Sequence, residues 1–195
     1  VHGRELWKSD GTEAGTVLVR DAVSGSSSSS PSWLTNLNGT LFFRAEDAAH
    51  GDELWKSDGT EAGTTLVSDI MPGSSDSDPI YLTTVGDTLY FVAGSYSSGN
   101  ERELWKTDGT EAGTVEVADI HPSDSSSPAN LVNFGGTLFF SADDGTNGRE
   151  LWKSGGTAAT TSLVKNIGTG GSDGLESWNA DLTVAPNRLF FEAQD

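Results

Sequence analysis

The chain has no cysteine, so neither a disulfide bond nor a thiolate metal site contributes to its structure or chemistry. Basic residues are also few, because 11 lysines and arginines stand against 29 aspartates and glutamates, for a formal charge of −18. A surface of this charge repels nucleic acid and anionic membranes, and it favours divalent cations or a salty medium. Long apolar runs are missing too. No segment approaches the roughly 20 apolar residues that cross a bilayer, so we expect no membrane insertion.

The chain also lacks an initiating Met and a recognisable signal peptide. We therefore expect a mature product or an excised fragment that has lost any targeting segment. A length of 195 residues suits one domain or one section of a longer array.

A twelve-residue motif recurs along the sequence. The string Glu-Leu-Trp-Lys-Ser-Asp-Gly-Thr-Glu-Ala-Gly-Thr begins at Glu5 and Glu53, at Glu103 with one Ser-to-Thr change, and at Glu150 in a degraded form. The tryptophans of the four copies stand at positions 7, 55, 105 and 152, so the intervals are 48, 50 and 47 residues. A fixed period in this range is typical of repeat proteins.

Each period contains four short segments rich in Leu, Val, Thr, Phe and Trp, separated by Gly, Asn, Asp or Ser, which is the pattern of strands and turns. In the second repeat we expect strands at 33–37, 40–45, 53–57 and 64–70. No window shows the helical period. The sequence therefore predicts an all-β fold, a β-propeller of four-stranded antiparallel blades.

The apolar pattern of single strands indicates that the blades stack. Leu41 and Phe43 point to one face of a strand and Phe42 points to the other, so both faces need cover. Neighbouring blades supply that cover. We expect the four motif tryptophans, Trp7, Trp55, Trp105 and Trp152, to pack between blades, and stacking on sugars is the alternative.

The end of the chain copies an internal segment, because residues 189–195 follow the pattern of residues 41–47. The two ends therefore meet at the same phase of the repeat. We predict a single repeat domain, 1–195, in which the first of four blades is split between the termini. The predicted blades are 4–21 plus 178–193, 33–70, 80–120 and 131–167. A section of a longer array, and a partial ring completed by self-association, both remain open.

The repeated block resembles the bacterial repeat named after its own sequence, ELWxxDGT, which occurs in large secreted or surface-attached proteins. The segments Asp69 to Ser74 and Gly39 to Asp47 follow the same pattern, and the resemblance covers essentially the whole chain. It implies a propeller-like extracellular module of bacterial origin with no established activity. The fourth copy departs from the pattern at Gly155, Ala158 and Thr160.

Acidic turns are the first candidate sites. Asp10, Asp58 and Asp108 each open an Asp-Gly-Thr-Glu cluster that could supply oxygen ligands to calcium. The competing interpretation is a hairpin connection in which Asp caps the turn, and we favour it because the spacing lacks alternating carboxylates. Asp143, Asp144 and Asn147 form a second dense group of oxygen donors, which suits calcium, sugar hydroxyls or a solvated turn.

Variable loops on a constant scaffold commonly carry recognition, and the Ser- and Pro-rich loops differ between copies. We expect them to share one face with the loops between the second and third strands, although they could equally be flexible connectors. The candidate ligand-binding residues on this face are Asp47, Asp52, Asp76, Asp78, Tyr96 and Asp124.

Other repeated polar residues are interpreted structurally. His2 and His50 are equivalent, but two copies in four without a ligand motif indicate surface histidines. Glu5, Glu53, Glu103 and Glu150 survive in every copy, so each needs a hydrogen-bonding partner between blades.

These features predict a non-catalytic extracellular scaffold for adhesion, surface display or ligand binding, with calcium as a candidate stabilising ion and carbohydrate or another surface protein as partner. A glycan-binding propeller lectin is the alternative. A propeller hydrolase is disfavoured, because near-identical copies offer no single asymmetric set of acid and base.

Overall fold

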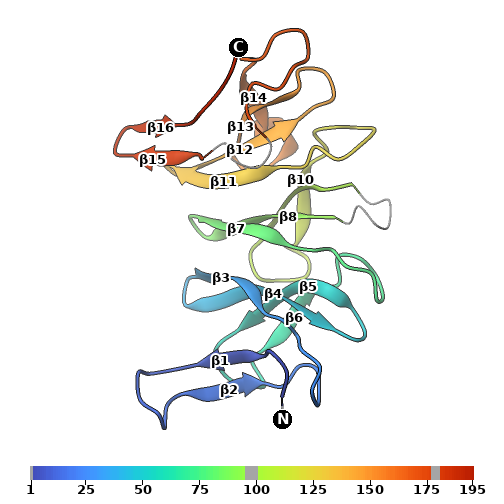
Figure 1. Ribbon diagram of the computed structural model, residues 1–195, viewed down its shortest axis with the longest axis vertical. Helices are drawn as coiled ribbons and strands as arrows, with labels where there is room; N and C mark the ends of the chain where they lie inside the picture. The colour runs from blue at the N-terminus through green and yellow to red at the C-terminus, as the bar shows by residue number, and fades with distance from the viewer. Residues whose placement is uncertain (1, 95–100, 177–180) are drawn as a thin grey trace.

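The structure is a computed structural model, and it describes residues 2–94, 101–176 and 181–195. Three four-stranded antiparallel sheets form the middle of the molecule, and the strands of each follow one another in sequence (Figure 1). We number the sheets along the chain, so that the two-stranded sheet at the N-terminal end is the first and these three are the second, third and fourth. The second sheet contains β3 (Ser32–Leu37), β4 (Thr40–Asp47), β5 (Gly51–Ser57) and β6 (Thr65–Ser68). The third contains β7 (Ile80–Val85), β8 (Thr88–Ala93), β9 (Glu103–Thr107) and β10 (Val115–Ala118). The fourth contains β11 (Ala129–Phe134), β12 (Thr137–Asp143), β13 (Arg149–Ser154) and β14 (Ser162–Lys165).

The four strands expected in the second repeat are all confirmed, and only their ends differ. β5 begins two residues before the expected 53, and β6 is shorter than 64–70 because the residues after Ser68 leave the sheet to form the connection to the third sheet. The single helical element among the described residues is a short 3-10 turn, η2 (Ala158–Thr160). No helix in the described part of the chain is long and apolar enough to cross a membrane.

Consecutive sheets pack face to face and come closest at their first strands. β3 contacts β7, β7 contacts β11, and β11 contacts β15 (Thr183–Ala185), so these strands lie side by side along the left of Figure 1. We call them the inner strands. The outer strands β6, β10 and β14 lie on the opposite side of their sheets. This arrangement is compatible with propeller blades, whose first strands converge.

The hydrophobic core lies between sheets rather than within one. Phe42 and Leu54 of the second sheet pack with Leu89 and Phe91 of the third. The strands are thus covered on both faces, as their apolar pattern predicts. Trp55 is buried against the first sheet, whereas its equivalent Trp7 is exposed and does not fill an interface as expected. Trp105 and Trp152 are partly buried against the preceding sheet, as expected.

The first and last sheets each have only two strands. The first contains β1 (Leu6–Lys8) and β2 (Val17–Arg20), and the terminal sheet contains β15 and β16 (Arg188–Phe190). They lie at opposite ends of the molecule and do not pair with each other (Figure 1). The split first blade and the closed four-bladed ring are therefore not formed. The three complete sheets between them stack along one axis, so the length of this stack separates the two-stranded sheets, which we call half-sheets.

Candidate functional site

The repeated glutamate of the motif is buried and binds the segment that leads to the next sheet. We call the segments 21–31, 69–79 and 119–128 the connectors. Glu53 accepts hydrogen bonds from the Ser77 hydroxyl at 2.6 Å, the Met71 N–H at 3.1 Å and the Ile70 N–H at 3.2 Å. Glu5 and Glu103 bind their own connectors in the same way, through Ser29 and Ser126. The partner that the buried carboxylate requires is therefore the connector between sheets.

Burial dominates the electrostatics of Glu53 and Glu103. It raises the pKa of Glu53 to about 7, although hydrogen bonds from Ser77, Met71 and Ile70 favour the charged form. Burial likewise raises the pKa of Glu103 to about 7 against the bonds from Ser126 and Ile120. The raised pKa of both groups thus results from their burial in the fold. Neither Glu53 nor Glu103 lines the groove described below as a candidate binding site.

The fourth copy keeps the glutamate but changes its partner. Gly174 stands where Ser29, Ser77 and Ser126 stand, so no hydroxyl reaches the carboxylate. The Glu150 carboxylate accepts a bond from the Gly168 N–H at 2.7 Å, and its Oε2 has no partner within the described chain.

The motif lysine joins one sheet to the next. Lys8 Nζ donates to the Gly59 carbonyl at 2.8 Å, and Lys56 Nζ donates to the Gly109 carbonyl at 2.7 Å. Lys106 repeats the contact with Gly156. Gly59 and Gly109 belong to the Asp-Gly-Thr turn of the next sheet, and Gly156 occupies the equivalent position in the degraded fourth copy. Two parts of the motif therefore contact each other across each of these three interfaces.

The Asp-Gly-Thr clusters are self-contained turns. Asp58 Oδ1 accepts bonds from the Thr60 N–H at 2.8 Å and the Thr60 hydroxyl at 2.7 Å. Asp10 and Asp108 make the same bonds with Thr12 and Thr110. Hydrogen bonds from these threonines lower the pKa of each aspartate. The hairpin interpretation accounts for this geometry, because the carboxylate oxygen that would bind an ion already holds two donors.

The loop with Asp143, Asp144 and Asn147 is also closed on itself. Asp144 Oδ1 accepts the N–H groups of Thr146 and Asn147, and its Oδ2 accepts the Asn147 amide at 2.7 Å. Asp143 Oδ1 accepts the Gly145 N–H at 2.8 Å. Within the described residues, no group of three His, Cys, Asp or Glu side chains is placed to hold a metal ion.

Three of the expected ligand-binding aspartates meet around one arginine. Arg44 on β4 forms ion pairs with Asp52 and, at 2.7 Å, with Asp78, while Asp76 accepts the Asp52 N–H at 2.9 Å. The cluster ties β4 and β5 to the connector, so its carboxylates are engaged internally.

The remaining candidates on that face stay apart from this cluster. Asp47 pairs with His50, whose Nδ1 lies 2.9 Å from its carboxylate. Asp124 is exposed and accepts only the Ser125 N–H. Tyr96 lies outside the described residues. His2 pairs with Asp21 at 2.8 Å, so each of these two histidines contacts a carboxylate of its own repeat.

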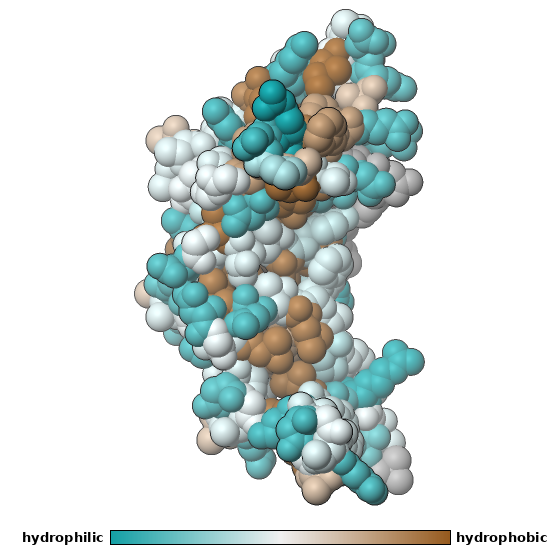
Figure 2. Space-filling model, turned by 90° about the vertical axis from the view of Figure 1, so that its left-hand side faces the viewer, coloured by the Kyte–Doolittle hydropathy of each residue, from teal (hydrophilic) through white to brown (hydrophobic). Residues whose placement is uncertain are grey.

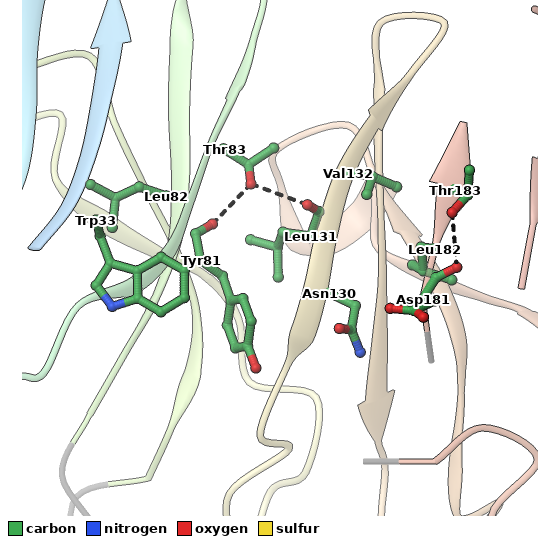
Figure 3. A pocket seen from close by; sticks show the side chains of 10 residues that line it. All are labelled: Trp33, Tyr81, Leu82, Thr83, Asn130, Leu131, Val132, Asp181, Leu182 and Thr183. Carbon is green, nitrogen blue, oxygen red and sulfur yellow. Dashed lines mark hydrogen bonds between the residues drawn. The ribbon is translucent and has the colours of Figure 1, made fainter. Parts of the chain in front are cut away.

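A groove across the inner strands was not predicted from the sequence. It has a volume of about 280 Å³ and is lined by residues of β3, β7, β11 and the start of β15. Figure 3 shows Trp33, Tyr81 and Asn130 following one another along it, with Asp181 at the far end. The ring centroids of Trp33 and Tyr81 are 5.2 Å apart, and the angle between the two ring planes is 54°. We call Trp33, Tyr81 and Asn130 the groove row.

All three members of the groove row adopt the left-handed backbone conformation, with φ of 55°, 57° and 56°. Each lies at a bulge, where the register of the inner strand shifts against its partner. A left-handed non-glycine residue costs on the order of 1–3 kcal/mol, and such strain is concentrated at functional sites. The bulge recurs at the same position of each complete sheet and turns a different side chain toward the groove.

The walls of the groove are held by threonines. Thr83 Oγ1 donates to the Leu131 carbonyl of the next inner strand at 3.2 Å (Figure 3). Thr35 makes the equivalent bond to Leu82 at 3.3 Å. The Asn130 amide nitrogen is buried without a partner among the described residues. The Asn130 side chain lines the groove, and its buried nitrogen is an unsatisfied hydrogen-bond donor.

The apolar character of this side is visible from outside. Figure 2 views the molecule from the left of Figure 1, and brown side chains lie along the middle of this face among polar ones. Trp33 and Leu34 on β3 are among the exposed large apolar residues. The available sequence signal was a repeat position that holds Trp33, Tyr81 and Asn130, each followed by a leucine. Trp178 follows a Ser as Trp33 does, and it lies outside the described residues. A comparison with family models and curated proteins found no match to this chain.

Proposed function

We propose that the chain is a non-catalytic extracellular binding module used in adhesion, and that its inner-strand groove binds carbohydrate. The observation that carries the proposal is the groove row, two aromatic side chains and an amide presented in sequence by three strained bulges.

The chemistry of the groove suits a sugar. A pyranose presents C–H groups on its ring faces, which pack against aromatic rings, and hydroxyls at its edge, which bond to amides and carboxylates. Trp33 and Tyr81 offer the rings, and Asn130 and Asp181 offer the polar groups. The volume of about 280 Å³ is near the lower limit of ligand pockets, on the order of 300 Å³, and suits one or two sugar rings of a longer glycan. The acidic chain favours a neutral glycan over an anionic one.

The polar lining of the groove supports a binding role over catalysis. Asp181 is the one carboxyl among the described residues that line the groove, and none of those residues is a histidine. Glycoside hydrolysis normally requires a pair of carboxyl groups at defined separation. An extracellular setting is supported by the strong negative charge, which suits a salty medium, and by the resemblance to the bacterial surface repeat.

A glycan array followed by calorimetry with a neutral oligosaccharide from the array tests the proposal. We expect saturable binding that Trp33→Ala weakens about tenfold, because an aromatic contact of this kind contributes roughly 0.5–1.5 kcal/mol beyond its buried area. Trp7→Ala is the matched control, since Trp7 is a tryptophan outside the groove and is 54% exposed, against 43% for Trp33. Failure of the whole array to bind, or equal losses in the two variants, would contradict the proposal.

A further inference from the structure

The repeat position that supplies the groove row is occupied once more, by a carboxylate. Trp33, Tyr81 and Asn130 are each followed by a leucine and stand eight residues before a second leucine. Asp181 has leucines at the same two places. The inner strands β3, β7, β11 and β15 contact one another in this order. One repeat position thus presents two aromatic rings, an amide and a carboxylate in succession along the groove (Figure 3).

The Asp181 carboxylate is not engaged by the fold. Its side chain is exposed, and within the described residues it accepts no hydrogen bond and forms no ion pair. Asp52 and Asp78, by contrast, are held by Arg44. The described residues that line the groove include no lysine, arginine or histidine. The negative charge at this end of the groove is therefore open to a ligand.

The charge of the whole chain acts in the same direction. The formal charge is −18, and a cleft in a surface of one sign concentrates the potential and raises the local concentration of ions of the opposite sign. Cationic ligands are attracted to such a groove and anionic ligands are repelled. Charge complementarity therefore favours a ligand that carries a positive group.

A small cation does not match the whole length of the groove. The rings of Trp33 and Tyr81 belong to β3 and β7, whereas Asp181 lies beyond β11, beside the start of β15. A single ammonium group, such as that of one lysine side chain, meets one end and leaves the other uncovered. A ligand that contacts both ends must extend across the inner strands, as a chain of sugar rings does.

We propose that the groove binds a linear glycan that contains a free amino sugar, with the ammonium group at Asp181 and a neighbouring ring against Trp33 and Tyr81. The proposal presupposes the carbohydrate-binding role given above and names the class of sugar. The ammonium donates charge-assisted hydrogen bonds to the carboxylate, which are stronger than the bond from a hydroxyl. The buried amide nitrogen of Asn130, without a partner among the described residues, donates to a hydroxyl oxygen between the two ends.

Calorimetry with three tetrasaccharides tests the proposal. All share a β-1,4-linked backbone and differ at the second carbon of each ring, which carries an amine in glucosamine, an acetamide in N-acetylglucosamine and a hydroxyl in glucose. At about pH 6 the amine is protonated. We expect the glucosamine tetramer to bind about fivefold more tightly than the glucose tetramer, the gain of one solvent-accessible ion pair. High sodium chloride should reduce this advantage by screening the pair.

Variants of the chain locate the source of the advantage. Asp181→Asn should abolish it, so that the glucosamine and glucose tetramers bind equally, because the amide keeps the size of the side chain and removes its charge. Trp33→Ala should weaken the binding of all three tetramers. Glu61→Gln is the matched control, since it removes one exposed carboxylate outside the groove and should retain the advantage. Circular dichroism confirms that each variant is folded.

The outcomes separate the amino sugar from the broader role. If either neutral tetramer binds as tightly as the glucosamine tetramer, and Trp33→Ala weakens both, the amino-sugar proposal is overturned and carbohydrate binding stands. Binding of none of the tetramers overturns the proposal as well, and the glycan array then decides carbohydrate binding separately. Trilysine is the probe for basic peptides. If it binds as tightly as the glucosamine tetramer, the groove accepts basic peptides and the proposal is wrong.

Discussion

At the scale of single residues, the motif glutamate fixes the connector to the sheet that the connector leaves, and we call this buried contact a clasp. Glu53 lies at the start of one strand and holds two N–H groups and one hydroxyl of the connector that leaves the same sheet. Truncating one partner of such a buried group leaves the others unsatisfied, which costs on the order of 1–3 kcal/mol. This explains why the glutamate is kept even in the degraded fourth copy, where the serine is replaced by Gly174.

The same burial predicts that stability falls as pH rises. The pKa of Glu53 and of Glu103 is about 7 in the folded chain and close to 4.5 when exposed, so the folded state binds more protons between these values. The stabilisation is fully present below pH 4.5 and is lost as pH rises through about 7. Each shift corresponds to roughly 3 kcal/mol as an upper limit. Urea unfolding at about pH 5 and about pH 8 should therefore give the higher free energy of unfolding at the lower pH.

Glutamine variants identify which groups cause this dependence of the free energy of unfolding on pH, whose steepness we call the slope. Glu53→Gln combined with Glu103→Gln should flatten the dependence on pH, because the two titrating groups are gone. Glu61→Gln removes an exposed glutamate of the same repeat and should retain the slope. An unchanged slope in the double variant would show that it comes from other groups, such as the general repulsion among carboxylates.

At the scale of one element, the degraded turn proves to be a compensated exchange. In the second repeat a Cβ on Gly63 would lie 2.1 Å from the Asp58 carboxylate. In the fourth repeat Gly155 replaces the aspartate and Thr160 replaces the glycine. The Thr160 hydroxyl then accepts the Thr157 N–H at 3.1 Å, which is the bond that the aspartate makes elsewhere. The side chain that accepts this bond thus comes from the other end of the turn in the fourth repeat, and the turn itself is preserved.

A double-mutant cycle in the second repeat tests this exchange. Gly63→Thr alone should lower the free energy of unfolding by about 1–3 kcal/mol through overpacking. Asp58→Gly alone should also destabilise, because the Thr60 N–H and hydroxyl lose their acceptor. The combined variant should recover most of the loss, with a coupling energy of about 1 kcal/mol or more. Additive losses in urea unfolding would mean that the two positions are independent.

The elements were largely predictable and their side-chain roles only partly so. The period-2 pattern and the turn residues identify the strands, because a strand apolar on both faces is recognisable locally. The bulges at Trp33 and Tyr81 left no local signature, because neither residue is a glycine or an asparagine, the types that favour a positive φ. The engagement of Asp52 and Asp78 by Arg44 was likewise invisible, because the connector carries Asp78 back beside β4.

At the scale of the whole molecule, the copied ends suggested a closed ring, and the structure is instead a bowed stack with two half-sheets (Figure 1, Figure 2). Sequence shows that the ends are complementary in phase but cannot give the rotation between successive sheets. That rotation depends on how inner strands such as β3 and β7 pack, which is a property of many side chains together. Repeat number alone therefore does not determine closure.

Calcium can be tested on the intact chain by thermal melting in calcium and in excess EDTA. We expect coincident midpoints, because the carboxylates of Asp58, Asp108 and Asp144 already accept local donors. An ion at 100 times its dissociation constant would add roughly 2.7 kcal/mol and move the midpoint by several degrees. A rise in calcium that magnesium does not reproduce would contradict this expectation.

The clasps also determine how the molecule would respond to tension between its ends. Force applied along the stack passes from each sheet to the next through a connector, and each connector of the first three sheets is anchored by one buried glutamate, such as Glu53. The anchors therefore bear the load in series, and the weakest yields first. A repeat of 48 residues then lengthens to roughly 160 Å of extended chain while the others stay folded. The chain would therefore respond to a sudden pull by lengthening in steps.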